Sequence, residues 1–282
     1  MNKQLIVAGG GIILLAILFF LGKTAPNLKN QPNLSANTGN KEFNIKQFIE
    51  TEKQHLSSSQ ALQLSQLENS ITRGDIPAQQ IQIYNQLATF WKDSTHAIEP
   101  YFFYLSEAAK LDNSEKNLTF AAQLILDNLR EETDAAKINW KAQQAISLFE
   151  KAIEQNPNND DLKIGLGSCY VFGKGRLGDA QETMKGVQQL LEIVRRDSTN
   201  MKAQMVLGIG GSISGQYDKA IERFKKVIAM QPNNLEAVAF LADCYAAKGE
   251  KNEAIKWYQL SKRLANDPHY SQEVDQRIKS LQ

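Results

Sequence analysis

Three glycines between residues 173 and 178 have a spacing that could support nucleotide chemistry. The segment GKGRLG matches the GxGxxG pattern of a dinucleotide-binding loop, and Asp197 follows its last glycine by about twenty residues, where such loops carry an acid for the ribose. That chemistry requires a strand before the glycines and a βαβ unit around them. Residues 162–172 and 190–196 instead have helical patterns. We therefore interpret the glycine segment as a loop between two helices.

The histidines and cysteines form no catalytic or metal-binding pattern. His55, His96 and His269 are scattered, and none belongs to an HExxH helix. The sequence also contains no GxSxG elbow, no Walker loop and no cluster with metal-ligand spacing. Cys169 and Cys244 have no CxxC or histidine partner, so we interpret both as small buried thiols. We expect a protein that is not an enzyme and has no cofactor, no metal and no small-molecule substrate.

The charge balance argues against nucleic acid as a partner. Lys and Arg number 32 and Asp and Glu number 31 in the 282 residues, which gives a net charge of +1. Lys3, Lys23 and Lys29 precede Lys41 without any acidic residue between them, so the remainder is slightly acidic. A nucleic-acid-binding protein needs a clustered basic face, and this sequence shows none.

Two consecutive units of 34 residues, 201–234 and 235–268, set the register of the chain. The matched positions are Leu207, Gly208, Ala220, Phe224 and Val227 with Leu241, Ala242, Ala254, Tyr258 and Ser261. Self-similarity at this period indicates stacked helical hairpins. The spacing resembles that of the tetratricopeptide repeat (TPR), in which small residues let neighbouring helices approach closely. The resemblance implies an all-α fold, a right-handed solenoid of antiparallel helix pairs.

The same pattern, in weaker form, extends over most of the chain. We expect the solenoid to cover residues 43–282, with degenerate repeats at 81–200 and an amphipathic capping helix at 270–281. The loop near residues 131–136 is expected to be longer than the family pattern. About seven extra residues are expected within 173–183, between the two helices of one repeat.

The N-terminus carries a candidate membrane anchor. Residues 5–21, LIVAGGGIILLAILFFL, are uninterrupted apolar sequence, near the lower end of the roughly 17–25 residues that span a bilayer as a helix. We predict a single transmembrane signal anchor at 1–22. A cleaved signal peptide is the alternative, but its apolar core usually has about 7–15 residues. Pro26 also follows the one plausible cleavage point, after Ala25.

The segment after this run separates the anchor from the repeats. Residues 23–42 are rich in asparagine, contain two prolines and have few apolar residues, which predicts a flexible tether. The flanking charges do not decide the orientation. A short tail before a large domain is typical of a signal anchor with a cytoplasmic N-terminus. We therefore expect a single-pass protein of the bacterial inner membrane with its repeats on the periplasmic side.

The resemblance also predicts a partner-binding groove lined by the first helices of successive repeats. The groove-facing positions are Asp161, Ile164, Ser168, Phe172, Lys202, Met205, Ile209, Ser212, Glu236, Ala239 and Asp243. Members of each set lie three or four residues apart and share a helix face. TPR domains that clamp a chaperone carboxylate carry Lys and Asn at such places, whereas Ile164, Met205 and Ile209 here suit an apolar or amphipathic helix. Packing of these residues against the next repeat is an equal alternative.

Two functions are consistent with these features. The first is a membrane-anchored TPR scaffold or adaptor that holds a protein partner in its groove. The alternative is a structural, self-associating component of a larger envelope complex, in secretion or cytochrome c assembly, an analogy at the level of layout.

Overall fold

The computed structural model describes residues 42–71, 76–95 and 97–282. The predicted signal anchor at 1–22 and all but the last residue of the predicted tether at 23–42 lie outside these residues. Contacts divide the chain into residues 1–37 and 38–282, and the described residues belong to the second unit. Within them, no helix combines the length and the hydropathy needed to cross a membrane.

Helices make up the regular structure of the described residues. In chain order these are α2 (Ile45–Lys53), α3 (Ser58–Ile71), α4 (Pro77–Ser94), α5 (Ile98–Asp112), α6 (Glu115–Glu131), α7 (Ala135–Gln155), α8 (Asp160–Cys169), the π-helical segment η1 (Tyr170–Gly175), α9 (Ala180–Arg196), α10 (Met201–Ile213), α11 (Tyr217–Met230), α12 (Leu235–Ala247), α13 (Lys251–Ala265) and α14 (Pro268–Leu281). The predicted all-α class is confirmed.

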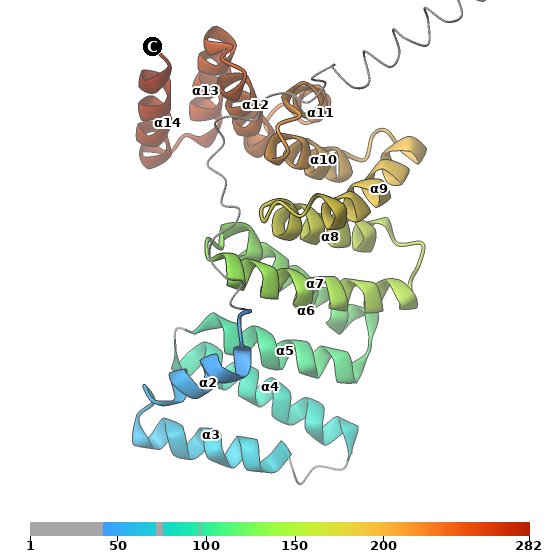
Figure 1. Cartoon of the computed structure of the whole chain (residues 1–282), viewed down its shortest axis with the longest axis vertical. Helices are drawn as coiled ribbons and strands as arrows, with labels where there is room; N and C mark the ends of the chain where they lie inside the picture. Colours follow the sequence, from blue (N-terminus) through green and yellow to red (C-terminus); the bar gives the residue numbers. More distant parts are fainter. Residues whose placement is uncertain (1–41, 72–75, 96) are drawn as a thin grey trace, which may run out of the picture. The chain divides into compact units, whose positions relative to one another are not determined.

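Consecutive helices pack as hairpins that follow one another in chain order (Figure 1). The pairs are α4 with α5, α6 with α7, α8 and η1 with α9, α10 with α11, and α12 with α13. Hairpins α10–α11 and α12–α13 occupy the two 34-residue units, and α14 packs on α13. The repeat period in the sequence thus corresponds to one hairpin.

Short polar residues determine where the first helices of the hairpins begin. The N-cap residues of α8, α10 and α12 are Asn159, Asn200 and Asn234. The side-chain oxygen of each accepts a hydrogen bond from a backbone N–H in the first turn of its helix. Such caps replace hydrogen bonds that the helix itself cannot provide. After α10 and α12, Gly215 and Gly249 have φ angles of 74° and 78°, a conformation that glycine adopts freely.

Small residues allow the two helices of a hairpin to approach closely. A Cβ atom on Gly208 of α10 would lie 2.6 Å from the ring of Phe224 in α11. A Cβ atom on Gly167 of α8 would lie 2.8 Å from Leu190 in α9. These glycines therefore have the packing role that the repeat pattern implied.

The glycine segment 173–178 does not begin as a loop. α8 continues directly into η1, and α9 starts at Ala180 after the N-cap Asp179. Part of the predicted insertion thus lengthens the first helix of its repeat. A Cβ atom on Gly173 would lie 2.3 Å from the Cβ atom of Ala142 in α7, so close packing explains this glycine. The loop expected to be long near 131–136 is short, because α7 begins four residues after α6 ends.

The N-terminal helices surround a smaller core of their own. α2 packs on α5 and α3 packs on α4. Their shared core contains Ile49, Leu64, Leu87, Trp91 and Tyr104. α5 also belongs to the main core, through the buried residues Phe102 and Ala109. The first helices therefore close one end of the array, whose other end is closed by α14.

A buried ionic cluster joins α5 to α7 and to the loop before it. The Nζ atom of Lys141, a residue only 1% exposed, lies 2.5 Å from Glu132 and 3.3 Å from Glu99. The Nζ atom of Lys137 lies 2.9 Å from Glu99. Burial alone would raise the pKa of Glu132, but hydrogen bonds from Lys141 and from two backbone N–H groups lower it to about 2. Each buried charge thus has a partner of opposite sign, as burial requires.

Candidate partner-binding site

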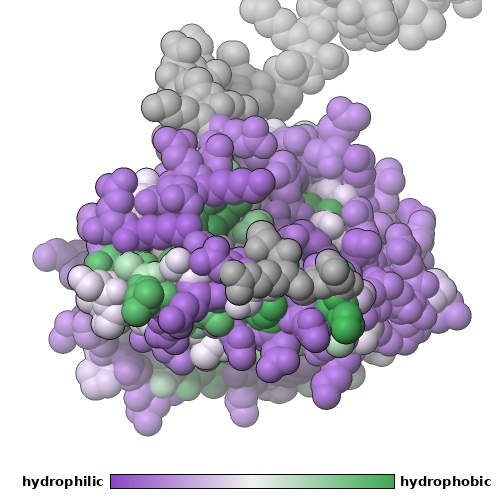
Figure 2. Space-filling model, turned by 90° about the horizontal axis from the view of Figure 1, so that it is seen from below, coloured by the Kyte–Doolittle hydropathy of each residue, from purple (hydrophilic) through white to green (hydrophobic). Residues whose placement is uncertain are grey.

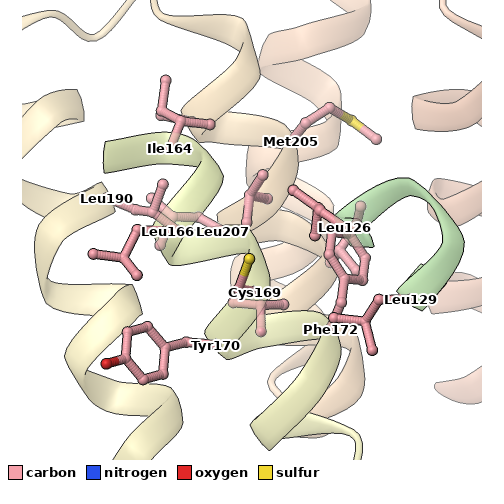
Figure 3. Packing of buried hydrophobic residues seen from close by; sticks show 14 of the residues in the cluster. Leu126, Leu129, Ile164, Leu166, Cys169, Tyr170, Phe172, Leu190, Met205 and Leu207 are labelled. Carbon is pink, nitrogen blue, oxygen red and sulfur yellow. The ribbon is translucent and has the colours of Figure 1, made fainter. Parts of the chain in front are cut away.

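The apolar residues predicted to line the groove are buried by the chain itself. Phe172 is 7% exposed, Met205 is 8% exposed and Ile209 is 3% exposed. Figure 3 shows Phe172 beside Leu126 and Leu129 of α6. A partner could reach Phe172 only if α6 moved away from η1.

Three further predicted residues pack within or between repeats. Ile164 and Ser168 are buried in α8, and the Ser168 hydroxyl donates to the Ile164 carbonyl at 2.7 Å. Ser212 is half-buried and hydrogen-bonds the Cys244 thiol. Burial raises the pKa of that thiol, which keeps it protonated and unreactive. For these residues the structure favours internal packing, the alternative left open by the sequence.

The charged residues of the predicted groove lie at the surface and form ion pairs. Lys202, whose side chain is 72% exposed, lies 2.8 Å from Asp161 and links the start of α10 to the start of α8. Glu236 in the first turn of α12 pairs with Arg130 in the last turn of α6. The Arg130 guanidinium also lies over the Phe172 ring, 4.7 Å from its centroid. Arg130 thus covers one of the buried apolar residues and connects two distant repeats.

The basic residues of the glycine segment contact α6 and α7. Arg176 donates to the carbonyl oxygens of Leu129 and Glu132 at 3.0 Å and 2.6 Å. Carbonyls at a helix C-terminus have no partner within the helix, so Arg176 caps α6. Lys174 donates to the Asn139 side chain at 2.6 Å. The sequence pattern did not reveal this role, because the capped carbonyls lie more than forty residues away.

A small pocket of about 140 Å³ lies between α12, α13 and α14, and we name it the α12–α14 pocket. Its lining residues are Glu236, Ala239, Phe240, Asp243, Tyr258, Tyr270, Glu273, Val274 and Arg277. Glu236, Ala239 and Asp243 are positions that the repeat pattern assigned to the groove. The α14 residues were missed, because a capping helix lies outside the repeat pattern from which the groove was predicted.

A hydrogen-bond network fixes one wall of the α12–α14 pocket. Asp243 accepts hydrogen bonds from the Tyr258 hydroxyl at 2.5 Å and from Arg277 at 2.9 Å. Burial and the Asp243 carboxylate raise the pKa of Tyr258, so its phenol remains a donor at neutral pH. Glu236 and Glu273 also line this pocket. Asp243 pairs with Arg277 and Glu236 pairs with Arg130, so Glu273 is the lining carboxylate that neither guanidinium neutralises.

Known proteins share the helical repeats of this chain. Residues 141–190 and 213–272 match the family model described as tetratricopeptide repeat. The BBSome complex member BBS4 of Bos taurus is 28% identical over 149 residues, which are 53% of this chain and 27% of that protein. The Hsp70-Hsp90 organizing protein 1 of Glycine max is 24% identical over 140 residues, which are 50% of this chain and 23% of that protein. The matched regions thus span about a quarter of each relative.

A solved structure has the same fold. The crystal structure of a thermophilic TPR protein of Thermus thermophilus is 16% identical, with a TM-score of 0.51, and the match covers 73% of this chain and 98% of that one. Together with the family match, this likeness shows that the chain contains tetratricopeptide repeats in an all-helical solenoid.

Proposed function

We propose that this protein is a membrane-anchored TPR adaptor, which binds a segment of a partner protein at the α12–α14 pocket and carries out no catalysis. The observation that supports the site is that three residues assigned to the groove by the repeat pattern, Glu236, Ala239 and Asp243, line this pocket. The names of the matched relatives describe a complex member and an organizing protein. Both descriptions agree with a role in holding other proteins together.

The pocket favours a basic side chain from the partner. A volume of about 140 Å³ accommodates one side chain rather than a whole helix. Asp243 pairs with Arg277 and Glu236 with Arg130, which leaves the Glu273 carboxylate for a cation from the partner. Tyr258, Tyr270 and Phe240 present aromatic surface in the same pocket. Cations are attracted both to carboxylates and to aromatic faces. A Lys or Arg inserted from the partner would meet both.

Filling the pocket tests the proposed site. Ala239→Trp is expected to weaken partner binding at least tenfold, because the indole occupies the space for the partner's side chain. Ala229→Trp is the matched control, since Ala229 is exposed on α11 away from the pocket. Crosslinking of the full chain in native membranes would identify the partner, and titration with it would measure affinity. Equal binding by both variants would overturn the proposed site.

The membrane location is a separate part of the proposal. The apolar run at 5–21 supports an anchor, and we propose that it holds the repeats on the periplasmic side of a bacterial inner membrane. Protease treatment of intact spheroplasts tests this location. Digestion of the repeats without lysis is expected, whereas protection until lysis would place them in the cytoplasm.

A further inference from the structure

A second surface, at the N-terminal end of the described repeats, has no role in the proposed function. A groove of about 750 Å³ follows α4 from Ala78 to Ser94, and α3 contributes Gln63 and Leu67 to it. Seen from this end, Figure 2 shows hydrophobic residues exposed between hydrophilic ridges. We name this surface the α3–α4 groove.

The α3–α4 groove is almost free of charge. Among the described residues that line it, Asp93 is the one ionisable residue, and the other polar side chains are amides and hydroxyls, such as Gln82, Asn85 and Thr89. The adjoining helix α3 also carries one charged residue, Glu68, which lies 2.9 Å from Lys53 of α2. The outward surface of α3 is therefore uncharged.

Two large apolar side chains of this end of the described repeats are exposed outside the lining of the groove. Leu62 of α3 is 62% exposed, and Ile76, just before α4, is 56% exposed. A repeat array needs a polar outer face on its terminal helices to remain soluble. Exposed apolar side chains such as Leu62, on a helix that also lines a groove, instead indicate an interaction surface.

We infer that the α3–α4 groove receives α3 of a second copy of this chain, about a two-fold axis. The 14 residues of α3 span about 21 Å, and α4 from residue 78 to 94 spans about 26 Å, so the helix fits within the length of the groove. In a two-fold contact each residue recurs on the other copy, which brings like charges together. The outward surface of α3 is uncharged, and Asp93 is the one charged residue among the described residues of the groove, so little repulsion opposes this contact. Leu62 then inserts into the partner's groove.

This contact would give the protein two identical pockets in one assembly. The inference is independent of the proposed function, because it uses none of the residues of the α12–α14 pocket. A dimer would present two such pockets at once, and a partner with two binding segments would gain avidity without any new contact.

Disulfide trapping between two tagged copies tests the contact. One full-length copy carries Leu62→Cys and the other carries Gln86→Cys in the groove wall, both in native membranes. Native Cys169 and Cys244 are buried and should not react. Oxidation is expected to yield a mixed disulfide-linked dimer. Met230→Cys replaces Leu62→Cys in the control, since Met230 is also 62% exposed but lies on α11. Equal yields from the two combinations would overturn the inference.

The mass of the detergent-solubilised full chain provides a second measurement. The wild type is expected to have the mass of two copies, and Leu62→Glu the mass of one, because a carboxylate would be buried in the apolar groove. Leu62 is exposed within one copy, so this substitution should leave the fold of each copy, and its circular dichroism spectrum, unchanged. A wild-type mass of one copy, or an unchanged mass in Leu62→Glu, would contradict the two-fold contact.

Discussion

Arg130 and Glu236 form an ion pair across 106 residues of sequence, and the same guanidinium lies over the Phe172 ring. Two complete hairpins separate α6 from α12 in the chain. Both side chains are partly exposed, at 39% and 44%, so the pair itself should stabilise the fold by about 0–1 kcal/mol. Its importance is geometric, because it fixes the guanidinium over Phe172, an apolar residue that the repeat pattern assigned to the groove.

Reversing the charge of Arg130 should separate α6 from α12. In Arg130→Glu, two carboxylates would face each other, and the distance between spin labels at Glu131→Cys and Asn233→Cys should become longer and more broadly distributed in pulsed EPR. The exchange Arg130→Glu with Glu236→Arg should restore the original distribution. If all three proteins gave the same distances, the ion pair would not hold these helices together.

Removing the buried amine of Lys141 should strongly destabilise the fold. Lys141→Met removes the cation that Glu99 and Glu132 share in a buried site. Removing one partner of a buried ion pair lowers the free energy of unfolding by about 3–5 kcal/mol. Urea denaturation measures the free energy of unfolding. Lys137→Met is the comparison, because the Lys137 side chain is 29% exposed and water can replace part of its interaction. Similar losses in both variants would argue against a special role of burial.

Acid should weaken the fold through Glu132. Its pKa in the folded protein is about 2, below the ordinary value of 4.5. The deprotonated carboxylate therefore stabilises the folded state relative to the unfolded state. This contribution is complete above the ordinary pKa and is lost as the pH falls from about 5 towards 2. The urea midpoint should decline over this range, and the decline should be shallower in Glu132→Gln. An identical slope in the variant would exclude Glu132 as its source.

Two glycines of α10 should respond oppositely to substitution by alanine. A Cβ atom at Gly208 would lie 2.6 Å from the buried Phe224 ring, whereas one at Gly210 would make an ordinary contact with Val171 at 3.4 Å. Gly208→Ala should cost roughly 1–3 kcal/mol through overpacking. Gly210→Ala should be neutral or stabilise by up to about 1 kcal/mol through helix propensity. Thermal unfolding would compare them, and equal shifts would refute the packing argument.

Several features of the fold could be predicted because they depend on neighbouring residues. Asn200 and Asn234 cap helices in their own repeats, and Gly208 meets Phe224 within one hairpin. A period of 34 residues records that local pairing. Hairpins α10–α11 and α12–α13 accordingly match the units recognised from Leu207 and Leu241.

Which helix faces are exposed to solvent depends on contacts between residues far apart in the chain, and the sequence pattern did not predict these contacts. Met205 and Ile209 share a helix face, as their spacing predicted, but both are buried within the chain, where α10 packs on α8, η1 and α9. How successive repeats pack, and so which faces remain open, is set by contacts such as Gly173 with Ala142 and Arg130 with Glu236. Periodicity specifies which residues share a face. Only the packing of separate repeats decides whether that face meets solvent, a partner or the chain itself.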